Sequence, residues 1–324
     1  MTYKYLCYSE TLYAFLQYLL INKMDIENTL FIFSESMDKL IGENFKCNKI
    51  ILKKKKGTFF QKKKIEYQNY KKLNSILSNS KEIKVYLQDH LPEAEYFLEK
   101  FNCYLLEDGT DSYNLKKINR NQKEYRRKKY KIRLLRKLLG GALRRYPKYG
   151  FSNKVIGIYM NGFFEIPNEL KKKVIKLDIK KLFNSLTNEE KEKLFNIFSL
   201  KLDILNKIEN KILLLTQPLS EDGVMIENEK IGLYKDVQKK FKGNFVIKSH
   251  PREQTDYQKY FSEVYILPQN FPAELFLFID AKLSEVVTIF STAALNLKGS
   301  YKVSFLGTRD YSKLLERFGV IEDK

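Results

Sequence analysis

The sequence is poor in several residues that support common kinds of site. It has no tryptophan, two histidines (His90 and His250) and three cysteines (Cys7, Cys47 and Cys103). So few histidines, with cysteines far apart along the chain, argue against a zinc site of the usual Cys/His type. The cysteines show no pairing pattern, so we expect free thiols, as in a reducing compartment. We therefore expect no catalytic metal and no resident cofactor.

Long apolar runs are absent as well. No stretch of the sequence approaches the roughly 20 apolar residues that a membrane-spanning helix needs. The first ten residues, MTYKYLCYSE, contain no basic segment followed by a sustained apolar one, so we expect no signal peptide. These absences predict a cytoplasmic protein whose association with a membrane, if it has one, is peripheral.

Positive charge is abundant and uneven. The chain carries 59 Lys and Arg against 39 Asp and Glu, a formal net charge of +20. Between Lys116 and Lys148 there are 15 basic residues and one acidic residue, Glu124. Such a block is typical of nucleic-acid binding, of attachment to an anionic membrane, or of a solvated surface. From Tyr125 to Lys148 the basic residues flank an apolar stripe, which favours an anionic membrane surface over a merely solvated one.

Apolar runs alternate with segments of helical periodicity, which predicts parallel sheets covered by helices. In the first hundred residues we expect a helix over 10–20, helical segments near 62–77 and 93–101, and strands over 3–9, 29–35, 47–53, 83–88 and 102–108. Alternation restarts near residue 211. There we expect helices near 229–241, at 271–279 and from 292, and strands over 211–218, 243–251, 262–268, 285–291 and 301–307.

The two alternating halves predict an α/β fold with two Rossmann-like domains that face each other across a cleft. We place the first domain at residues 1–155, with the basic segment 116–148 at its end, and the second at residues 211–324. Residues 156–210 are predicted to be a helical connecting region. Within it, Thr187 followed by Glu190 indicates a capping box at the start of a helix.

Three short polar stretches follow predicted strands. They are LLEDGT at 105–110, IKSHPRE at 247–253 and IFSTAALNL at 289–297. Open parallel sheets bind ligands at the carboxyl ends of their strands. If the two halves face each other, the three stretches meet, and one site explains all of them.

The first stretch offers a carboxylate. Asp108 could take a proton from an attacking hydroxyl, and Gly109 allows a tight turn with close ligand approach. Asp-Gly is also a frequent turn dipeptide, so a simple turn is the alternative. A second copy of the motif, SEDG at 220–223, makes Glu221 and Asp222 competing candidates for the base.

The other two stretches suit an anion. His250 follows a strand, is fixed by Pro251 and has Lys248 and Arg252 nearby, so an imidazolium there could bind a phosphate and protonate it. Ser291 and Thr292 sit where a strand turns into a helix, which suits phosphate binding. The alternatives are a partly buried histidine and an ordinary pair of N-cap residues. His90, in QDHLPE, lacks such neighbours and is interpreted as a loop residue.

In this order, the acidic-acidic-Gly, His-Pro and paired-hydroxyl motifs resemble those of bacterial sialyltransferases. More closely, the chain resembles glycosyltransferase family 52, the lipooligosaccharide α-2,3-sialyltransferases of Gram-negative bacteria. The stretches that carry this resemblance are YLCYSETLYA, LEDGTDSYNL, ILLLTQPL, VIKSHPRE, LPQNFPAELF and IFSTAALNL, which span nearly the whole chain.

The resemblance implies a GT-B fold and an inverting, metal-independent transfer of N-acetylneuraminic acid from CMP-Neu5Ac to the terminal galactose of a glycolipid. Asp108 would be the base, with Asp222 or Glu221 as the alternative, and His250 would assist departure of the CMP phosphate. The donor would be held by Gly109, Thr216, Gln217, Pro218, Lys248, Ser249, Pro251, Glu274, Ser291 and Thr292. A homodimer is implied by the resemblance alone.

Two other functions compete with this one. A family member on the same scaffold could use another nucleotide-activated sugar, such as a hexose. A basic protein of pI 9.5 could also bind nucleic acid. The sequence contains no nucleic-acid-binding motif, and nucleic-acid binding would leave the three strand-end stretches unexplained, so we expect no nucleic-acid partner.

Overall fold

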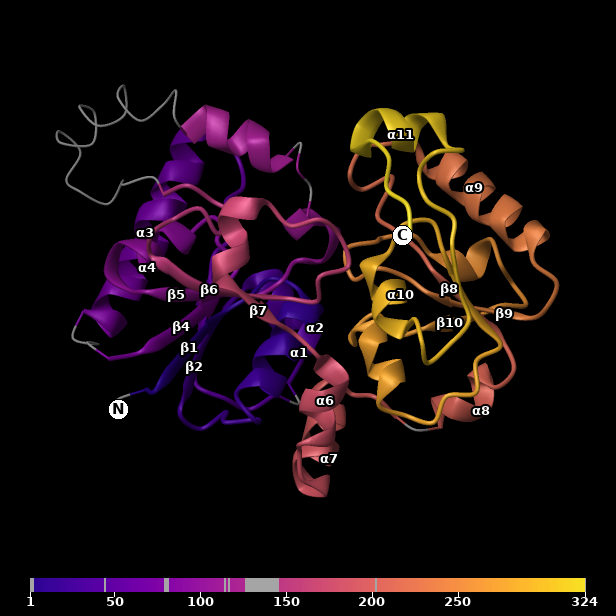
Figure 1. The fold of residues 1–324 in the computed structure, drawn as a ribbon, viewed down its shortest axis with the longest axis horizontal. Helices are drawn as coiled ribbons and strands as arrows, with labels where there is room; N and C mark the ends of the chain where they lie inside the picture. The colour runs from indigo at the N-terminus through magenta and orange to yellow at the C-terminus, as the bar shows by residue number, and fades with distance from the viewer. Residues whose placement is uncertain are drawn as a thin grey trace. The chain divides into compact units, whose positions relative to one another are not determined.

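The computed structural model describes residues 3–43, 45–78, 82–113, 115, 117–125, 146–201 and 203–323. The chain divides into two compact units, Met1–Ile197 and Phe198–Lys324, and each contains one parallel sheet (Figure 1). The predicted α/β class with two Rossmann-like domains is confirmed. Of the predicted basic segment 116–148, Lys116 and residues 126–145 lie outside the described residues.

The first unit is built on a seven-stranded sheet of order β3-β2-β1-β4-β5-β6-β7. The strands are β1 (Tyr5–Tyr8), β2 (Thr29–Ser34), β3 (Lys49–Leu52), β4 (Lys84–Leu87), β5 (Cys103–Leu105), β6 (Val155–Met160) and β7 (Val174–Lys176). Its described helices are α1 (Leu12–Ile21), α2 (Glu35–Ile41), α3 (Phe59–Leu77), α4 (Ala94–Lys100), α6 (Ile179–Asn184) and α7 (Asn188–Ile197), with 3₁₀ helices η1 (Gly109–Tyr113) and η2 (Asn168–Lys173).

The second unit is built on a five-stranded sheet of order β10-β9-β8-β11-β12. The strands are β8 (Ile212–Leu215), β9 (Phe245–Lys248), β10 (Tyr265–Leu267), β11 (Glu285–Thr288) and β12 (Val303–Phe305). The described helices are α8 (Ile204–Ile208), α9 (Glu227–Lys240), α10 (Thr292–Leu297) and α11 (Ser312–Phe318), with 3₁₀ helices η3 (Tyr257–Lys259) and η4 (Ala273–Leu277).

The strand order of both sheets reverses at one point. In the first sheet the chain moves outward from β1 to β3 and then returns to the other side of β1 with β4. In the second sheet it moves outward from β8 to β10 and returns with β11. A doubly wound sheet binds ligands at such a switch point, because the loops leaving the two central strands diverge there. The switch points are therefore the carboxyl ends of β1 and β4, and of β8 and β11.

Buried strands and capped helices explain why this sequence forms these elements. The strands β2, β8, β9 and β11 are almost wholly buried, as expected for parallel strands covered on both faces. Thr11, Ser34 and Thr58 cap α1, α2 and α3 through their hydroxyls. The predicted Thr187–Glu190 capping box is confirmed, because each residue's backbone N–H donates to the other's side chain, at 2.7 and 3.2 Å.

The predicted domain boundaries are wrong. Residues 156–210 were expected to form a helical connection, but β6 and β7 extend the first sheet, and the units divide at Ile197/Phe198. The strand β7 has one half-buried and two exposed residues, so its sequence lacks the apolar run of an interior strand. The helix predicted over 271–279 is only the short 3₁₀ helix η4, which begins after Pro272.

Cys7, Cys47 and Cys103 are free cysteines, and Cys7 and Cys103 are buried. Among the described residues, no helix is both long enough and apolar enough to cross a membrane.

Candidate active site

Three adjacent strands of the second sheet bring most of the predicted site residues to one edge. The strand β8 lies between β9 and β11. Thr216, Gln217 and Pro218 follow β8, the segment Lys248–Pro251 lies at the end of β9, and Ser291 and Thr292 follow β11. These residues therefore surround the switch point between β8 and β11, where a doubly wound sheet binds its ligand.

His250 is held in a tight turn that orients its ring. Its backbone N–H donates to Glu253 Oε1 at 2.6 Å, and the N–H of Glu253 donates to the His250 carbonyl at 2.9 Å. The backbone N–H of Arg252 donates to His250 Nδ1 at 3.1 Å. Because Nδ1 accepts this bond, the neutral ring carries its proton on Nε2. His250 can therefore offer an N–H donor from Nε2.

Glu253 connects the ends of β8 and β9. Its side chain is fully buried and accepts hydrogen bonds from the Thr216 hydroxyl at 2.6 Å and the Tyr257 hydroxyl at 2.5 Å, besides the N–H of His250. Glu253 was not among the predicted site residues, although it lies three positions after His250. Thr216 is 2% exposed, so its hydroxyl serves this buried contact.

A buried lysine balances the carboxylate of Glu253. Lys230, on α9, has a fully buried side chain, and its Nζ lies 3.6 Å from Glu253, 3.0 Å from Glu221 and 3.4 Å from Glu227. Burial raises the pKa of Glu253, and the hydrogen bonds and Lys230 act against that rise. A buried charge is tolerated only when it is paired and hydrogen-bonded, so this cluster supports the whole edge.

Lys248 and Glu274 form a second buried pair of ionisable groups. Lys248 is 4% exposed, and its Nζ lies 4.7 Å from the centre of the Phe271 ring. Glu274, on η4, is 3% exposed and accepts a hydrogen bond from Asn296 of α10 at 3.1 Å. Burial lowers the pKa of Lys248 to about 7 and raises the pKa of Glu274 to about 7, and the attraction between the two charges opposes both shifts.

Replacing Glu274 with Gln should therefore change how stability depends on pH. The folded protein binds a proton at Glu274 up to pH about 7, whereas the unfolded chain releases it near pH 4.5, so ionised Glu274 costs stability as the pH rises through this window. Glu274→Gln removes this cost. We expect the variant to gain up to about 3 kcal/mol relative to wild type between pH 5 and pH 7, measured by urea unfolding. A difference in stability between the variant and wild type that stays constant from pH 5 to pH 7 would contradict the conclusion that Glu274 is a buried ionisable group.

The two hydroxyl residues after β11 differ from an ordinary helix cap. Ser291 is the N-cap residue of α10, but its side chain makes no capping hydrogen bond. Its backbone N–H instead donates to the hydroxyl of Thr288 at 3.1 Å. Ser291 and Thr292 are both half-buried at the switch point. A hydroxyl that is not used for capping fits a ligand contact better than the N-cap alternative.

In the first unit, Asp108 follows β5 and pairs with a histidine. His90 Nε2 lies 3.1 Å from Asp108 Oδ2, and the two side chains are 23% and 20% exposed. Burial alone would raise the pKa of Asp108, but the hydrogen bond and charge of His90 overcome that effect and hold the pKa below its ordinary value. Asp108 is therefore ionised at neutral pH and can accept a hydrogen bond or a proton.

His90 is more than the loop residue that the sequence predicted. It lies in the turn after β4, and β4 is the neighbour of β5 in the sheet. The carboxyl ends of adjacent parallel strands meet, so the topology brings His90 to Asp108. The ring of His90 also stacks on Tyr149, with ring centres 6.0 Å apart and planes 4° from parallel. His90 is the second residue after the predicted strand 83–88. The rule that parallel sheets bind ligands at the carboxyl ends of their strands would therefore have identified it.

The two acidic residues before Gly109 have separate roles. Glu107 is 1% exposed and accepts hydrogen bonds from the Tyr113 hydroxyl at 2.9 Å and the Asn161 N–H at 2.6 Å. It therefore holds the loop after β6 in place. Gly109 has φ +53°, in the left-handed region that favours glycine, and it begins the 3₁₀ helix η1. This turn leaves Asp108 as the partly exposed carboxylate of the pair.

The competing carboxylates of the second unit are strongly paired. Asp222 makes two hydrogen bonds to the guanidinium of Arg252, at 2.6 and 3.0 Å. Glu221 accepts from Lys230 and from the N–H of Gln254 at 2.7 Å, and its pKa is lowered because these bonds outweigh its partial burial. Both carboxylates therefore already bind positively charged side chains. Arg252 is also occupied by this ion pair.

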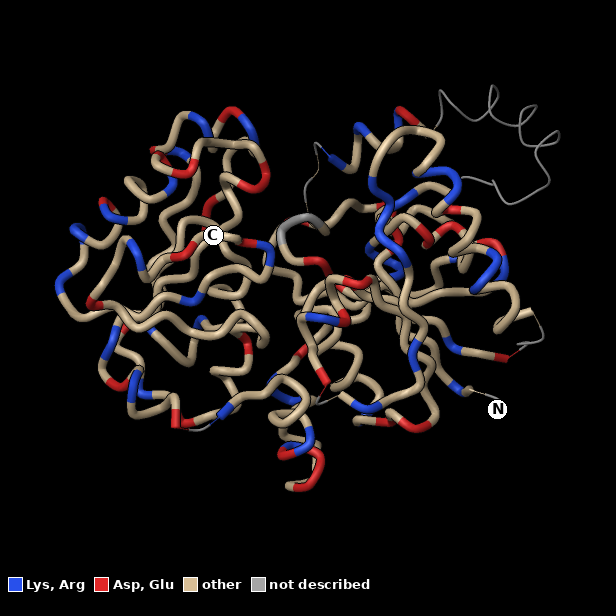
Figure 2. The backbone as a smooth tube through the Cα atoms, turned by 180° about the vertical axis from the view of Figure 1, so that it is seen from behind, with Lys and Arg blue, Asp and Glu red and all other residues tan. Residues whose placement is uncertain are grey.

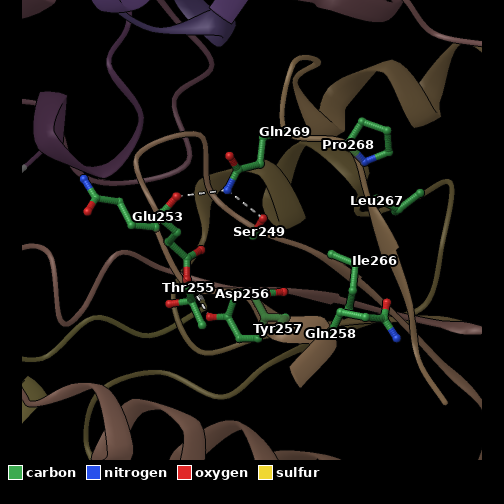
Figure 3. A pocket seen from close by; sticks show the side chains of 11 residues that line it. Ser249, Glu253, Thr255, Asp256, Tyr257, Gln258, Ile266, Leu267, Pro268 and Gln269 are labelled. Carbon is green, nitrogen blue, oxygen red and sulfur yellow. Dashed lines mark hydrogen bonds between the residues drawn. The ribbon is translucent and has the colours of Figure 1, made fainter. Parts of the chain in front are cut away.

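A cavity of about 480 Å³ lies beside this edge, between the ends of β9 and β10 (Figure 3). Its lining residues are Ser249, Glu253, Gln254, Thr255, Asp256, Tyr257, Gln258, Ile266, Leu267, Pro268 and Gln269. The amide of Gln269 donates to the hydroxyl of Ser249 at 3.0 Å and to the carbonyl of Glu253 at 3.1 Å. Of the predicted site residues only Ser249 lines the cavity, so the hydroxyls after β11 lie outside it.

Within the described part of the chain, no group of three or more His, Cys, Asp or Glu side chains could hold a metal ion.

The structure gathers one set of predicted residues at the switch point of the second sheet. It gathers another set, Asp108 with His90, beside the switch point of the first sheet. That the two sets face one cleft stays a prediction.

Comparison with known structures supports the fold. An α/β-galactoside α-2,3-sialyltransferase from Photobacterium phosphoreum superposes with a TM-score of 0.62 and 13% identity, covering 94% of this chain and 90% of that chain. A Photobacterium 2,6-sialyltransferase crystallised with CMP and lactose superposes with a TM-score of 0.57 and 12% identity, covering 97% of this chain and 75% of that chain. UDP-GlcNAc 2-epimerase from Methanocaldococcus jannaschii superposes with a TM-score of 0.52 and 11% identity, covering 99% of this chain and 94% of that chain. At these identities the likeness shows the GT-B fold.

Comparison of sequences shows the family. An uncharacterized protein of Haemophilus influenzae is 38% identical over 242 residues, which cover 74% of this chain and 72% of that protein. Residues 27–307 match glycosyltransferase family 52. This match includes both strand-end clusters, from β2 of the first sheet to the last strand of the second. The chain belongs to glycosyltransferase family 52.

Proposed function

We propose that this glycosyltransferase is a sialyltransferase, which transfers N-acetylneuraminic acid from CMP-Neu5Ac to the terminal galactose of a lipooligosaccharide or another surface glycan. The observation that carries the proposal is the set of anion-binding groups at the switch point between β8 and β11. The similarity in fold to a sialyltransferase that binds CMP and lactose supports the choice of donor and acceptor.

The second unit would bind the donor. In a transfer that forms an oxocarbenium-like transition state, negative charge develops on the departing CMP phosphate. His250 would donate a hydrogen bond from Nε2, and the hydroxyls of Ser291 and Thr292 would hold the phosphate. These positioned donors would stabilise the departing phosphate in place of a metal ion. Glu274 would lie near the ribose, and Thr216–Pro218 would line the nucleotide pocket.

Asp108 would be the general base. An inverting transfer needs a carboxylate that removes the proton of the acceptor hydroxyl on the side opposite the leaving group. Asp108 is ionised and partly exposed, and its partner is a histidine rather than a permanently charged group. Asp222 would have to break its paired bonds to Arg252 before it could serve.

Replacing His90 with Ala should shift the acid limb of the pH–rate profile. His90 lowers the pKa of Asp108, so its removal lets that pKa rise. A base with a higher pKa becomes protonated at a higher pH, so kcat/KM should begin to fall at a higher pH than in wild type, while the affinity for CMP is unchanged. The profile is measured by transfer to lactose between pH 4 and pH 8. An acid limb at the same pH in the variant and in wild type would show that His90 does not lower the pKa of the general base.

The choice of nucleotide separates the proposal from its nearest alternative. The same fold occurs in an epimerase that binds UDP-GlcNAc, so a family member that uses a UDP-hexose is the second candidate. We expect CMP to raise the unfolding temperature of the protein and UDP to leave it unchanged. Stabilisation by UDP alone would support the hexose alternative.

A further inference from the structure

The first two turns of α3 expose large apolar side chains. Phe59 is 69% exposed, Phe60 is 82% exposed and Tyr67, two turns later, is 70% exposed. The two phenylalanine rings contact each other edge to face, with ring centres 5.7 Å apart. Single exposed apolar residues are common on protein surfaces, but adjacent aromatic rings that are nearly fully exposed indicate a binding surface.

A dense cluster of lysines surrounds the rings. Seven lysines and no acidic residue occur between Lys53 and Lys64, namely Lys53, Lys54, Lys55, Lys56, Lys62, Lys63 and Lys64. All except Lys55 are exposed. Figure 2 shows that lysine and arginine occur on both units, but these lysines lie next to exposed aromatic rings. We call residues 53–67 the α3 patch; it contains one acidic residue, Glu66, which pairs with Lys63 at 2.6 Å.

The α3 patch is held firmly to the sheet. Its lysine-rich loop follows β3, and Lys55 Nζ lies 3.3 Å from the buried carboxylate of Glu93. The side chain of Asn69 bonds both the N–H and the carbonyl of Lys53, at 3.1 and 3.0 Å. A capping box formed by Thr58 and Gln61 fixes the start of α3. The exposed rings are therefore presented from a rigid support at the carboxyl edge of the first sheet, the edge that also carries Asp108.

We propose that the α3 patch docks the protein onto an anionic lipid surface, with Phe59 and Phe60 entering the interface and the lysines contacting the headgroups. Aromatic rings beside lysines on one helix face are the chemistry of an interfacial segment, since the rings enter the acyl boundary and the ammonium groups attract anionic headgroups. A hollow of about 400 Å³ at the start of α3 is lined by Lys56, Gln61 and Lys64, among others, and not by the two rings.

The charge of the patch selects this partner. Apolar rings alone would fit a protein groove, and lysines alone would fit any polyanion. The rings and the lysines together fit an anionic lipid surface, which has an apolar interior and negatively charged headgroups. On α3, Lys62 lies three positions after Phe59 and Lys64 four positions after Phe60, so each lysine neighbours a ring and both kinds of contact can form at once. The inference does not depend on which sugar donor the enzyme uses.

Vesicle binding tests the inference with the full chain. The probe is large unilamellar vesicles of phosphatidylcholine with or without one third phosphatidylglycerol, measured by co-sedimentation. We expect Phe59→Ser with Phe60→Ser to weaken binding to the anionic vesicles at least about tenfold. Lys54, Lys56, Lys62 and Lys64 changed together to Gln should weaken it by roughly a hundredfold at low salt. The matched control changes four other exposed lysines, Lys171, Lys172, Lys193 and Lys201, to Gln and should lose much less.

The absence of tryptophan provides a direct probe of insertion. Phe60→Trp creates a single fluorophore in the patch, and Ile226→Trp places one at a site on the second unit that is 65% exposed. With anionic vesicles the emission of Phe60→Trp should shift to the blue and be quenched by brominated lipid, whereas Ile226→Trp should not change. The inference is overturned if the serine variant binds vesicles like wild type, or if Phe60→Trp responds to a single-stranded oligonucleotide and not to vesicles.

Discussion

Glu253→Ala should destabilise the second unit by roughly 3–5 kcal/mol and abolish binding of CMP. Glu253 is fully buried and accepts hydrogen bonds from Thr216, His250 and Tyr257. Without it, three donors lose their acceptor, and Lys230 keeps its buried charge with one partner fewer. The turn that orients His250 also loses its anchor, so we expect no stabilisation by CMP. Urea unfolding and a thermal shift with CMP measure the two effects.

Two further variants separate this cluster from general damage. Tyr257→Phe removes one donor to Glu253 and should cost only about 1 kcal/mol, with CMP binding retained. Glu263→Ala removes an exposed carboxylate of the same unit and should change stability by less than about 0.5 kcal/mol. If Glu253→Ala lowered stability no more than Glu263→Ala, the buried cluster around Glu253 would not stabilise the edge of the sheet.

Asp108→Asn should lower the rate of sialyl transfer by about 10²–10⁴-fold while CMP binding and folding are retained. Asparagine has nearly the same shape but cannot take a proton from the acceptor hydroxyl. The carboxylate is partly exposed and bonded to His90, so its loss should cost less than about 1 kcal/mol of stability. The rate is measured as transfer from CMP-Neu5Ac to lactose at saturating donor.

Asp222→Asn is the matched variant, because it removes a carboxylate of the competing motif. Its pair with Arg252 lies on the surface, where the side chains are 33% and 60% exposed. We expect transfer to fall by less than about tenfold. If Asp222→Asn abolished transfer and Asp108→Asn did not, the base would belong to the second unit.

Most of the fold could be predicted, because buried parallel strands leave a plain signal. The runs at 29–35, 211–218 and 285–291 each carry consecutive apolar residues (LFIF, ILLL and VV), and each contains a strand that is almost wholly buried. The edge strand β7, Val-Ile-Lys, has no such run and was assigned to a helical connection. The boundary between the units was also misplaced, because β6 and β7 extend the first sheet beyond the expected end of that unit. The strand β6, VIGIYM, does carry an apolar run, but its residues were included in the connecting region.

The candidate site could be predicted only in part. Residues that follow a strand were found because chain order reveals them, as with His250 and Ser291. The pair of His90 with Asp108 depends on β4 and β5 being neighbours, which sequence order suggests but does not fix. Glu253 depends on burial next to Lys230, which lies 23 positions earlier and on another element. An acidic residue in a turn is normally exposed, so its burial left no signal in the sequence.

We propose that the chain transfers sialic acid, and a single reaction tests this proposal. Wild-type protein is incubated with CMP-Neu5Ac and lactose in the presence of EDTA, and the products are followed by NMR. We expect release of CMP and formation of sialyllactose with inverted configuration at the anomeric carbon. Absence of transfer from CMP-Neu5Ac, together with transfer from a UDP-hexose under the same conditions, would contradict it.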